Sequence, residues 1–260
     1  MKKLPFVSIL LLCIFFDADA QDTLRKIENN AFRCGELIRF RVYYGWISAG
    51  YATLEIKPEM VTRNGRESYR CVGIGESVGA FDWFFKVRDR YETYVDKDMI
   101  APLLFVRRVD EGGYKITQDY VFNHAEKRVF TGKEFKEIPA YIQDMISAFY
   151  FARCIDFSKA KEGDKFSIPC FVDDSLYYAN LKFIRRETIK TDLGTFKCIL
   201  FRPVIQTGRI FKHEEDLNVW ISDDENKVPI RAQASILVGS IKMDLVNYSG
   251  LTNPLAKVEK

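Results

Sequence analysis

Histidine is scarce in this sequence. His124 and His213 are the only two histidines among 260 residues, whereas zinc centres and Ser-His-Asp triads depend on imidazole groups. No spacing of Cys and His typical of a tetrahedral metal site occurs either. We therefore expect no metal, no cofactor and no catalytic residues, and we interpret both histidines as ordinary polar side chains.

Cysteine motifs of the redox type are also missing, because no two cysteines form a C-x-x-C pair. Without Cys13, which lies in the N-terminal apolar run, five cysteines remain: Cys34, Cys71, Cys154, Cys170 and Cys198. An odd number leaves at least one thiol unpaired in a monomer. A Cys34–Cys71 bridge would suit an exported protein, but the spacing does not fix a pairing. Cys198 is in register with Phe196 and Leu200 and is interpreted as a buried free thiol.

Long apolar runs are absent except at the N-terminus. There, residues 4–16 form an apolar run that follows Lys2 and Lys3 and leads to an A-x-A pattern at Ala18 and Ala20. This order is typical of a secretory signal peptide. We expect cleavage near Ala20 and a periplasmic or otherwise exported protein. No later segment approaches the roughly 20 apolar residues of a membrane helix, so we expect no transmembrane span in the mature chain.

Charge of one sign is not concentrated anywhere. The net charge is only +3, and basic and acidic residues are interspersed along the predicted strands. This disfavours a nucleic-acid-binding protein, which needs a basic patch. The composition is 47% hydrophobic and 14% aromatic, enough for a substantial core. We interpret residues 21–260 as a single β-rich domain.

The clearest pattern lies in residues 34–56, CGELIRFRVYYGWISAGYATLEI. One face of the first run carries Ile38, Phe40, Val42 and Tyr44, and the other carries Arg39, Arg41 and Tyr43. A period of two is typical of a half-buried strand. A second alternating run, 51–56, follows the glycine-bearing connection. Together they predict a β-hairpin.

Further strands are predicted along most of the chain. They cover 69–75, 85–95, 103–109, 114–122, 166–172, 177–186, 195–202, 217–221, 230–238 and 240–248. The exception is the middle, where Ile138, Ile142, Met145 and Phe149 follow a helical spacing. We predict one helix of about four turns there, starting near Pro139 and ending near residues 154–156.

So many antiparallel strands must curl or split into layers to bury one face. No period of 20 to 50 residues recurs, which excludes a propeller or a solenoid. We predict a mainly β fold, an antiparallel curved sheet that forms a barrel or half-barrel, with one central helix. A two-layer sandwich is the alternative, because alternation does not distinguish closure from stacking.

One motif suggests an enzyme. Residues 75–79, GESVG, match the G-x-S-x-G nucleophile elbow, with Ser77 as the nucleophile. The motif lacks alternating strands and helices around it, and residues 80–91 show strand-like alternation. A glycine-rich turn is the preferred interpretation, and a serine esterase is the weaker alternative. The pairs Asp173–Asp174 and Asp223–Asp224 are interpreted as turn residues.

Aromatic residues gather in two places and give the remaining functional hint. Those that we predict to bind a ligand are Tyr44, Trp46, Phe81, Trp83 and Phe84. An apolar concavity lined by aromatic rings suits a lipid tail or another amphiphile. The alternative is that these rings fill the interior of a curved sheet.

Several ordered segments resemble one bacterial family. They are residues 35–56, residues 81–96 (FDWFFKVRDRYETYVD), residues 168–174 (IPCFVDD) with 187–203, and residues 219–248. They look like the exported proteins of domain of unknown function 3108. The resemblance implies a cell-envelope protein and supplies no activity, cofactor or catalytic residue. A looser architectural similarity is to periplasmic lipoprotein carriers, half-barrels that hold acyl chains.

Three functional hypotheses follow. The first is a non-enzymatic periplasmic protein that binds an amphiphilic or lipid-like envelope molecule. The second is a structural or interaction protein that docks on another envelope protein through an edge or an exposed aromatic face. The third is the serine esterase. The decisive observation is whether the interior of the sheet is hollow or packed.

Overall fold

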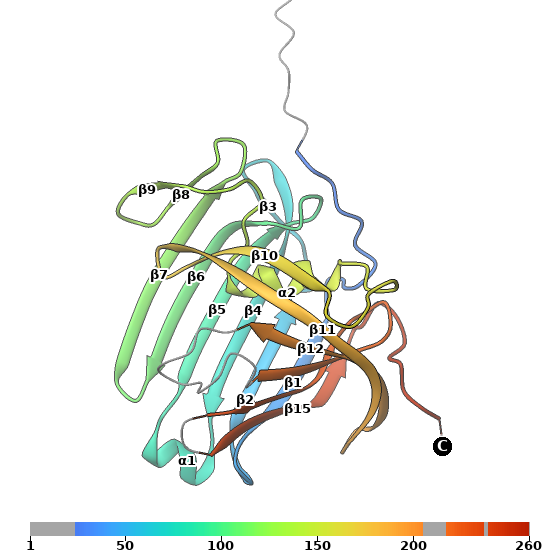
Figure 1. The fold of residues 1–260 in the computed structure, drawn as a ribbon. Helices are drawn as coiled ribbons and strands as arrows, with labels where there is room; N and C mark the ends of the chain where they lie inside the picture. Colours follow the sequence, from blue (N-terminus) through green and yellow to red (C-terminus); the bar gives the residue numbers. More distant parts are fainter. Residues whose placement is uncertain (1–23, 205–216, 237–238, 260) are drawn as a thin grey trace, which may run out of the picture.

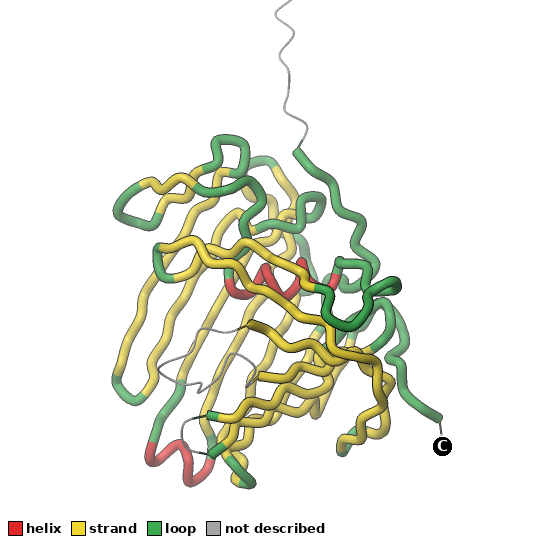
Figure 2. The backbone as a smooth tube through the Cα atoms, in the orientation of Figure 1, coloured by secondary structure: helices red, strands yellow, loops and turns green. Residues whose placement is uncertain are grey.

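The computed structural model describes residues 24–204, 217–236 and 239–259. The predicted signal peptide and His213 lie outside these residues. Within them, the strands form one large antiparallel sheet accompanied by two short helices (Figures 1 and 2). Neither helix is long and apolar enough to cross a membrane.

The first group of elements runs from the N-terminus to the central helix. It comprises β1 (Leu37–Tyr44), β2 (Ile47–Ile56), β3 (Val61–Arg63), β4 (Arg66–Ser77), α1 (Gly79–Phe84), β5 (Arg88–Asp96), β6 (Pro102–Glu111), β7 (Tyr114–Asn123), β8 (Arg128–Phe130), β9 (Phe135–Glu137) and α2 (Met145–Arg153). The second group comprises β10 (Lys165–Val172), β11 (Ser175–Thr191), β12 (Gly194–Val204), β13 (Leu217–Ser222), β14 (Pro229–Ser235) and β15 (Ser240–Ser249).

The sheet consists of a first meander, β1–β9, and a second meander, β10–β15, which are joined by the pairing of β15 with β1. Its strand order is β10-β11-β12-β13-β14-β15-β1-β2-β4-β5-β6-β7-β8-β9, with β3 paired to β4. The last strand, β15, thus lies beside the first, β1, with Ile38 opposite Tyr248. The predicted hairpin is confirmed, because Ile38 faces Leu54 across β1 and β2.

The two ends of the sheet approach each other without pairing as strands. The β10–β11 hairpin crosses toward β6 and β7 (Figure 1), where Arg107 donates to Asp173 at 2.8 Å and the Tyr120 hydroxyl donates to Asp174 at 2.8 Å. The ring of Phe171 packs edge-on against Tyr120, with centroids 5.1 Å apart. The fold is therefore the predicted curved, barrel-like antiparallel sheet, and the sheet is not closed.

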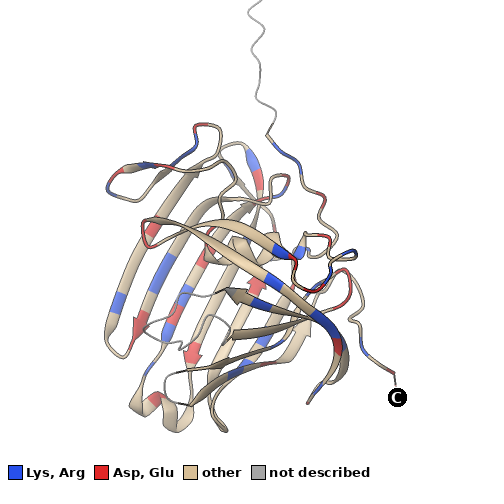
Figure 3. Cartoon of the chain, viewed as in Figure 1, with Lys and Arg blue, Asp and Glu red and all other residues tan. Residues whose placement is uncertain are grey.

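Charges of both signs are distributed along the strands (Figure 3). Opposite charges lie side by side on neighbouring strands, as with Arg70 and Glu92, whose Nε and Oε1 atoms are 2.8 Å apart. Burial opposes the ionisation of Glu92, but its hydrogen bonds with arginines and a tyrosine lower its pKa to about 2. The interspersed charges of the sequence therefore serve local cross-strand pairing.

The structure corrects the predicted length of the central helix. The helix begins at Met145 instead of near Pro139 and has nine residues. Ile138 and Ile142 are buried, but they lie in the preceding loop. Gln143 forms an isolated bridge with Cys170 in an extended conformation, which keeps this segment out of the helix.

The GESVG motif of residues 75–79 also differs from its predicted conformation. Gly75 and Ser77 belong to β4 instead of a glycine-rich turn, and residues 79–84, interpreted as strand-like, form α1. Gly79 has a φ of +60°, a value that glycine adopts readily, and the chain turns there into the helix. Glycine also has a packing role in β4, because a Cβ on Gly73 would lie 3.2 Å from both Ile146 and Leu54.

The central helix is fixed at its start by a buried carboxyl group. Asp144 accepts hydrogen bonds from the backbone N–H groups of Ile146 (2.7 Å) and Ser147 (2.8 Å) and from the hydroxyl of Thr93 (2.5 Å). The Ser147 hydroxyl accepts from the backbone of Asp144 at 2.8 Å, completing a capping box. Thr93 belongs to β5, so the cap also attaches the helix to the sheet.

The end of the helix is fixed by a buried ion pair. The Arg153 guanidinium donates to both carboxylate oxygens of Glu36, at 2.5 and 2.8 Å. It also donates to the carbonyl oxygens of Ala31 (2.9 Å) and Asn226 (2.7 Å). Both side chains are almost fully buried. One guanidinium thus joins α2, the segment before β1 and the β13–β14 loop.

We expect Arg153→Met to lower the free energy of unfolding by about 3–5 kcal/mol, because it leaves the carboxylate of Glu36 buried without a partner. Chemical denaturation measures this loss. Arg108→Met is the matched control, since Arg108 pairs with Asp119 on the surface, and it should cost less than about 1 kcal/mol. A loss no larger than the control's would contradict the structural role of the pair.

Burial raises the pKa of Asp144 from 3.8 to about 6. Between these two values the folded protein binds more protons than the unfolded chain, so this group lowers stability as pH rises through that window. The full effect is on the order of 3 kcal/mol. Asp144→Asn keeps a capping side chain and should flatten the decline between pH 4 and pH 6. Unfolding of both proteins across that range tests this, and identical pH profiles would refute it.

Candidate functional site

An apolar cavity lies between the central helix and the second meander. Its volume is about 210 Å³. The helix contributes Ala148, Phe149, Ala152 and Arg153, and the sheet contributes Ile168, Ala179, Leu181, Phe201, Pro203, Val219, Ile221 and Pro229, with Phe157 and Lys227 from the connecting segments. These sheet residues span β10 to β14, so the cavity occupies the curved part of that meander.

Local sequence explains why this space is not filled. Ala148 and Ala152 lie four residues apart and share one face of α2, and Ala179 and Leu181 share one face of β11 in the same way. Small side chains therefore occur in both walls of the cavity, among larger ones such as Phe149 and Phe201. In the first meander, the rings of Phe105 and Tyr120 stack on neighbouring strands with centroids 6.0 Å apart, and a separate cavity of about 430 Å³ lies toward β8 and β9, lined by Leu103, Phe122 and Phe130.

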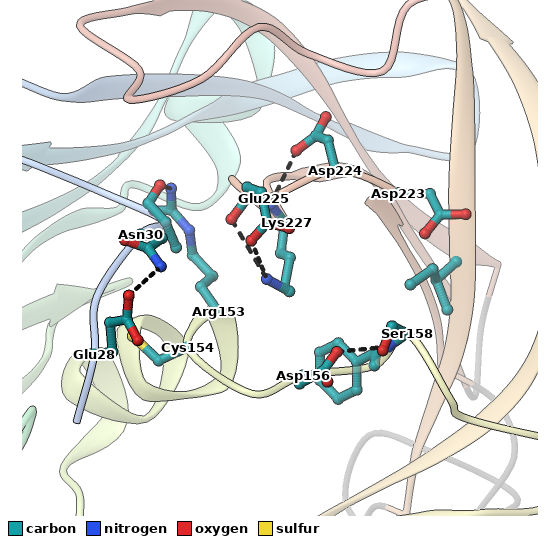
Figure 4. A pocket seen from close by; sticks show the side chains of 13 residues that line it. Glu28, Asn30, Arg153, Cys154, Asp156, Ser158, Asp223, Asp224, Glu225 and Lys227 are labelled. Carbon is teal, nitrogen blue, oxygen red and sulfur yellow. Dashed lines mark hydrogen bonds and ion pairs between the residues drawn. The ribbon is translucent and has the colours of Figure 1, made fainter.

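A larger polar cavity adjoins the apolar one. Its volume is about 530 Å³, and its lining comes from the N-terminal segment, the end of α2 with the following loop, and the β13–β14 loop (Figure 4). The polar and charged residues that line it are Glu28, Asn30, Arg153, Cys154, Asp156, Ser158, Asp223, Asp224, Glu225 and Lys227. Arg153, Phe157 and Lys227 line both cavities, so the two cavities are neighbours.

Some of these polar groups form hydrogen bonds and ion pairs that hold the loops in place. Asp224 accepts hydrogen bonds from the Ser222 hydroxyl (2.9 Å) and from the backbone of Asn226 (2.9 Å) and Ala256 (2.6 Å). Asp223 pairs with Arg186 at 3.1 Å. The β13–β14 loop is therefore a preformed wall, and both predicted aspartate pairs lie in turns.

Lys227 marks the border between the cavities. Its side chain is largely buried, and its ammonium lies 3.8 Å from the Glu225 carboxylate and donates to the Glu225 carbonyl oxygen at 3.4 Å. Asp156 and Glu28 lie on the same polar side, held by the backbone N–H of Ser158 and the amide of Asn30. The arrangement offers polar partners on one side of Lys227 and apolar walls on the other.

The residues that the sequence predicted as ligand-binding lie elsewhere. Tyr44 and Phe81 are neighbours, with ring centroids 6.2 Å apart, and so are Trp83 and Phe84 at 5.4 Å. Phe81 lines a small cavity of about 160 Å³ beside β2 and β4. Trp46, Trp83 and Phe84 are 89%, 86% and 78% exposed and line neither of the cavities described above. Their role in ligand binding stays a prediction.

Ser77 of the esterase motif is buried. Its hydroxyl donates to Asp82 of α1 and accepts from the backbone N–H of Val87 at 2.8 Å. Arg88 pairs with the same aspartate at 2.7 Å and lowers its pKa. The serine thus fastens α1 to β4 and β5, and no histidine contacts it in the described residues.

His124 is a structural residue. One ring nitrogen, Nε2, lies 2.7 Å from the Pro102 carbonyl oxygen, and Nδ1 accepts from the backbone N–H of Tyr141 at 3.1 Å. Burial lowers its pKa, so the neutral ring is favoured. No group of three or more metal-ligating side chains occurs in the described ranges.

The five cysteines of the described chain are free thiols. Cys71 is buried in one core cluster, and Cys34 and Cys154 pack against that cluster without a disulfide. Cys198 is a buried free thiol, as predicted, and burial raises its pKa to about 12. A thiol with such a pKa is unreactive near neutral pH.

Sequence reasoning missed the residues that line the cavities. Two signals could have indicated them: alanines at positions 148 and 152 on the face of the predicted helix that meets the sheet, and a small residue, Ala179, on a half-buried strand. Lys227 carried no signal, because a lysine in a turn is ordinarily a surface residue.

Comparison with known proteins supplies the family. The family described as Protein of unknown function (DUF3108) matches residues 39–246. This chain belongs to that family. No curated protein matches the sequence.

Solved structures similar to this DUF3108 protein have low sequence identity to it. A beta-barrel-like protein of domain of unknown function DUF1849 from Brucella abortus has a TM-score of 0.56 at 10% identity, over 84% of this chain and 99% of its own. A second structure, described as an exported protein with a YmcC-like fold from Bacteroides fragilis, has a TM-score of 0.38 at 11% identity. The match covers 86% of this chain and 99% of the other. The first likeness supports a common barrel-like fold, and the second is too weak for any argument.

Proposed function

We propose that this protein binds an amphiphilic molecule without catalysing a reaction. The apolar tail occupies the cavity between α2 and β10–β14, and the polar end occupies the adjoining polar cavity. The observation that carries the proposal is the shared wall of Arg153, Phe157 and Lys227. A small apolar space beside a larger polar one, with three lining residues in common, has the two-sided character of an amphiphile.

The cavity sizes restrict the ligand. Pockets for drug-sized molecules measure roughly 300–1,000 Å³, and the apolar cavity, at about 210 Å³, is smaller than that range. It therefore holds one short acyl segment and not the tails of a whole phospholipid. The polar cavity, at about 530 Å³, has room for a head group.

A series of fatty acids of increasing length tests the proposal. Each buried CH₂ group contributes about 0.8 kcal/mol, so affinity should rise roughly fourfold per carbon and then level off once the cavity is filled. Displacement of a fluorescent fatty acid measures the affinities. An affinity that keeps rising with length, or no uptake of any member, would refute the assignment of this cavity.

Two variants block the cavity from opposite walls. Ala148→Leu on α2 and Ala179→Leu on β11 should each weaken binding at least tenfold, because the added side chain takes the space of the tail. Ala52→Leu is the matched control, since Ala52 lies on the same sheet and lines the small cavity near Phe81 instead. Equal loss in all three variants would mean that the effect is not specific to this cavity.

We also infer that the protein acts in the cell envelope after export, as the signal-peptide pattern of residues 1–20 indicates. A mature N-terminus at Gln21 is expected. Intact-mass measurement of protein recovered from the periplasm checks this, and a full-length chain retained in the cytoplasm would contradict it.

A further inference from the structure

Exposed aromatic side chains are concentrated at one end of the sheet. We call Trp46, Ile47, Trp83, Phe84, Phe85 and Tyr114 the aromatic rim. Of seven aromatic residues that are largely exposed in the described part of the chain, five belong to it. Isolated exposed apolar residues need no explanation, but a cluster on one face marks an interaction surface.

The rim is assembled from three separate segments. The β1–β2 turn carries Trp46, α1 carries Trp83, and the two meet through the ring contact of Tyr44 with Phe81. Phe85 joins them to the β6–β7 turn, where a Cβ on Gly112 would lie 2.7 Å from its ring. In Figure 1, α1 and the neighbouring strand ends lie at the opposite end of the sheet from β8 and β9.

The two tryptophans of the rim protrude from the end of the sheet. Trp46 and Trp83 are almost fully exposed, and ideal Cβ atoms on Gly45 and Gly79 meet nothing within 4 Å. These residues therefore stand on protruding chain tips. Tryptophan on protruding tips suits the interfacial region of a bilayer, where its amphipathic ring is enriched.

Most charges around the rim are paired or turned inward. Three nearby carboxylates are neutralised by cations: Asp82 by Arg88 at 2.7 Å, Glu76 by Arg39 at 3.4 Å, and Asp110 by Lys115 at 3.1 Å. Two more, Asp89 and Glu111, interact with each other instead of with a cation, and Asp89 is buried. Lys86 lies between α1 and β5, is exposed, and forms no ion pair with the described residues. A cation beside exposed aromatic rings is the combination that anionic lipid head groups attract.

We propose that the aromatic rim docks the protein on an anionic lipid surface. Trp46, Trp83 and Phe84 enter the head-group region, and Lys86 meets lipid phosphates. The contact is peripheral and reversible, because the segments involved are turns and one short helix. This proposal is independent of amphiphile binding, since the rim and the two cavities share no residue.

Flotation with vesicles tests the proposal with the full mature chain. The protein should float with vesicles of phosphatidylglycerol and phosphatidylethanolamine and bind phosphatidylcholine vesicles several-fold less. The triple variant Trp46→Ser, Trp83→Ser, Phe84→Ser should lose at least tenfold in partitioning. The control Leu176→Ser, Tyr178→Ser removes exposed apolar side chains of β11 and should change it less than twofold.

Tryptophan fluorescence supplies a second readout. Trp46 and Trp83 should shift to shorter wavelengths on binding vesicles, whereas the Trp46→Phe, Trp83→Phe variant should show no shift. That variant retains only Trp220, which is half-buried and donates to Glu187 at 2.7 Å.

Three outcomes would overturn the lipid proposal. The wild-type protein fails to bind anionic vesicles, the triple variant binds as well as wild type, or sedimentation shows a dimer that the triple variant abolishes while vesicles bind neither protein. Ala179→Leu should weaken fatty-acid binding and keep vesicle binding unchanged. Failure of one proposal is therefore distinguishable from failure of the other.

Discussion

The buried ion pair between Arg153 and Glu36 is the contact on which the rest of this structure depends. An arginine inside a protein is tolerated only when its donors are used, and here they reach a carboxylate and two backbone carbonyl oxygens. The arginine and its partners come from three parts of the chain that are far apart in sequence. The pair therefore fixes where the central helix ends, where β1 begins and where the β13–β14 loop lies.

The same contact shapes the candidate site. Arg153 lines both cavities, and its hydrogen bond to the carbonyl oxygen of Asn226 holds the loop that carries Lys227. Because the guanidinium is occupied by Glu36, its function there is to position walls and not to bind a ligand's charge. Polar partners for a ligand are then left to Lys227 and to the side chains on the outer side of the polar cavity.

Sequence alone was sufficient to predict the strands in which apolar and polar residues alternate over enough positions to show a two-residue period. It predicted the β1–β2 hairpin, the curved antiparallel sheet and the family. It failed where a local contact decides the conformation. The capping of α2 by Asp144 shortens the predicted helix, and the hydrogen bond from Ser77 to Asp82 holds a helix where alternation suggested a strand. The three-residue strands β3, β8 and β9 are too short to be recognised by periodicity.

The candidate site was harder to predict because an empty space is defined by the residues that do not fill it. Aromatic residues drew the sequence interpretation toward Trp46 and Trp83. Trp46 lies in a turn and Trp83 in a short helix, so the two-residue period of a strand cannot say which way they point. The alanines of α2 and β11 line the apolar cavity, while the rings of Phe105 and Tyr120 stack between β6 and β7. In the first hairpin of this chain the strands and the turn thus differ in role: the strands supply core residues such as Ile38 and Phe40, and the turn leaves Trp46 exposed to solvent.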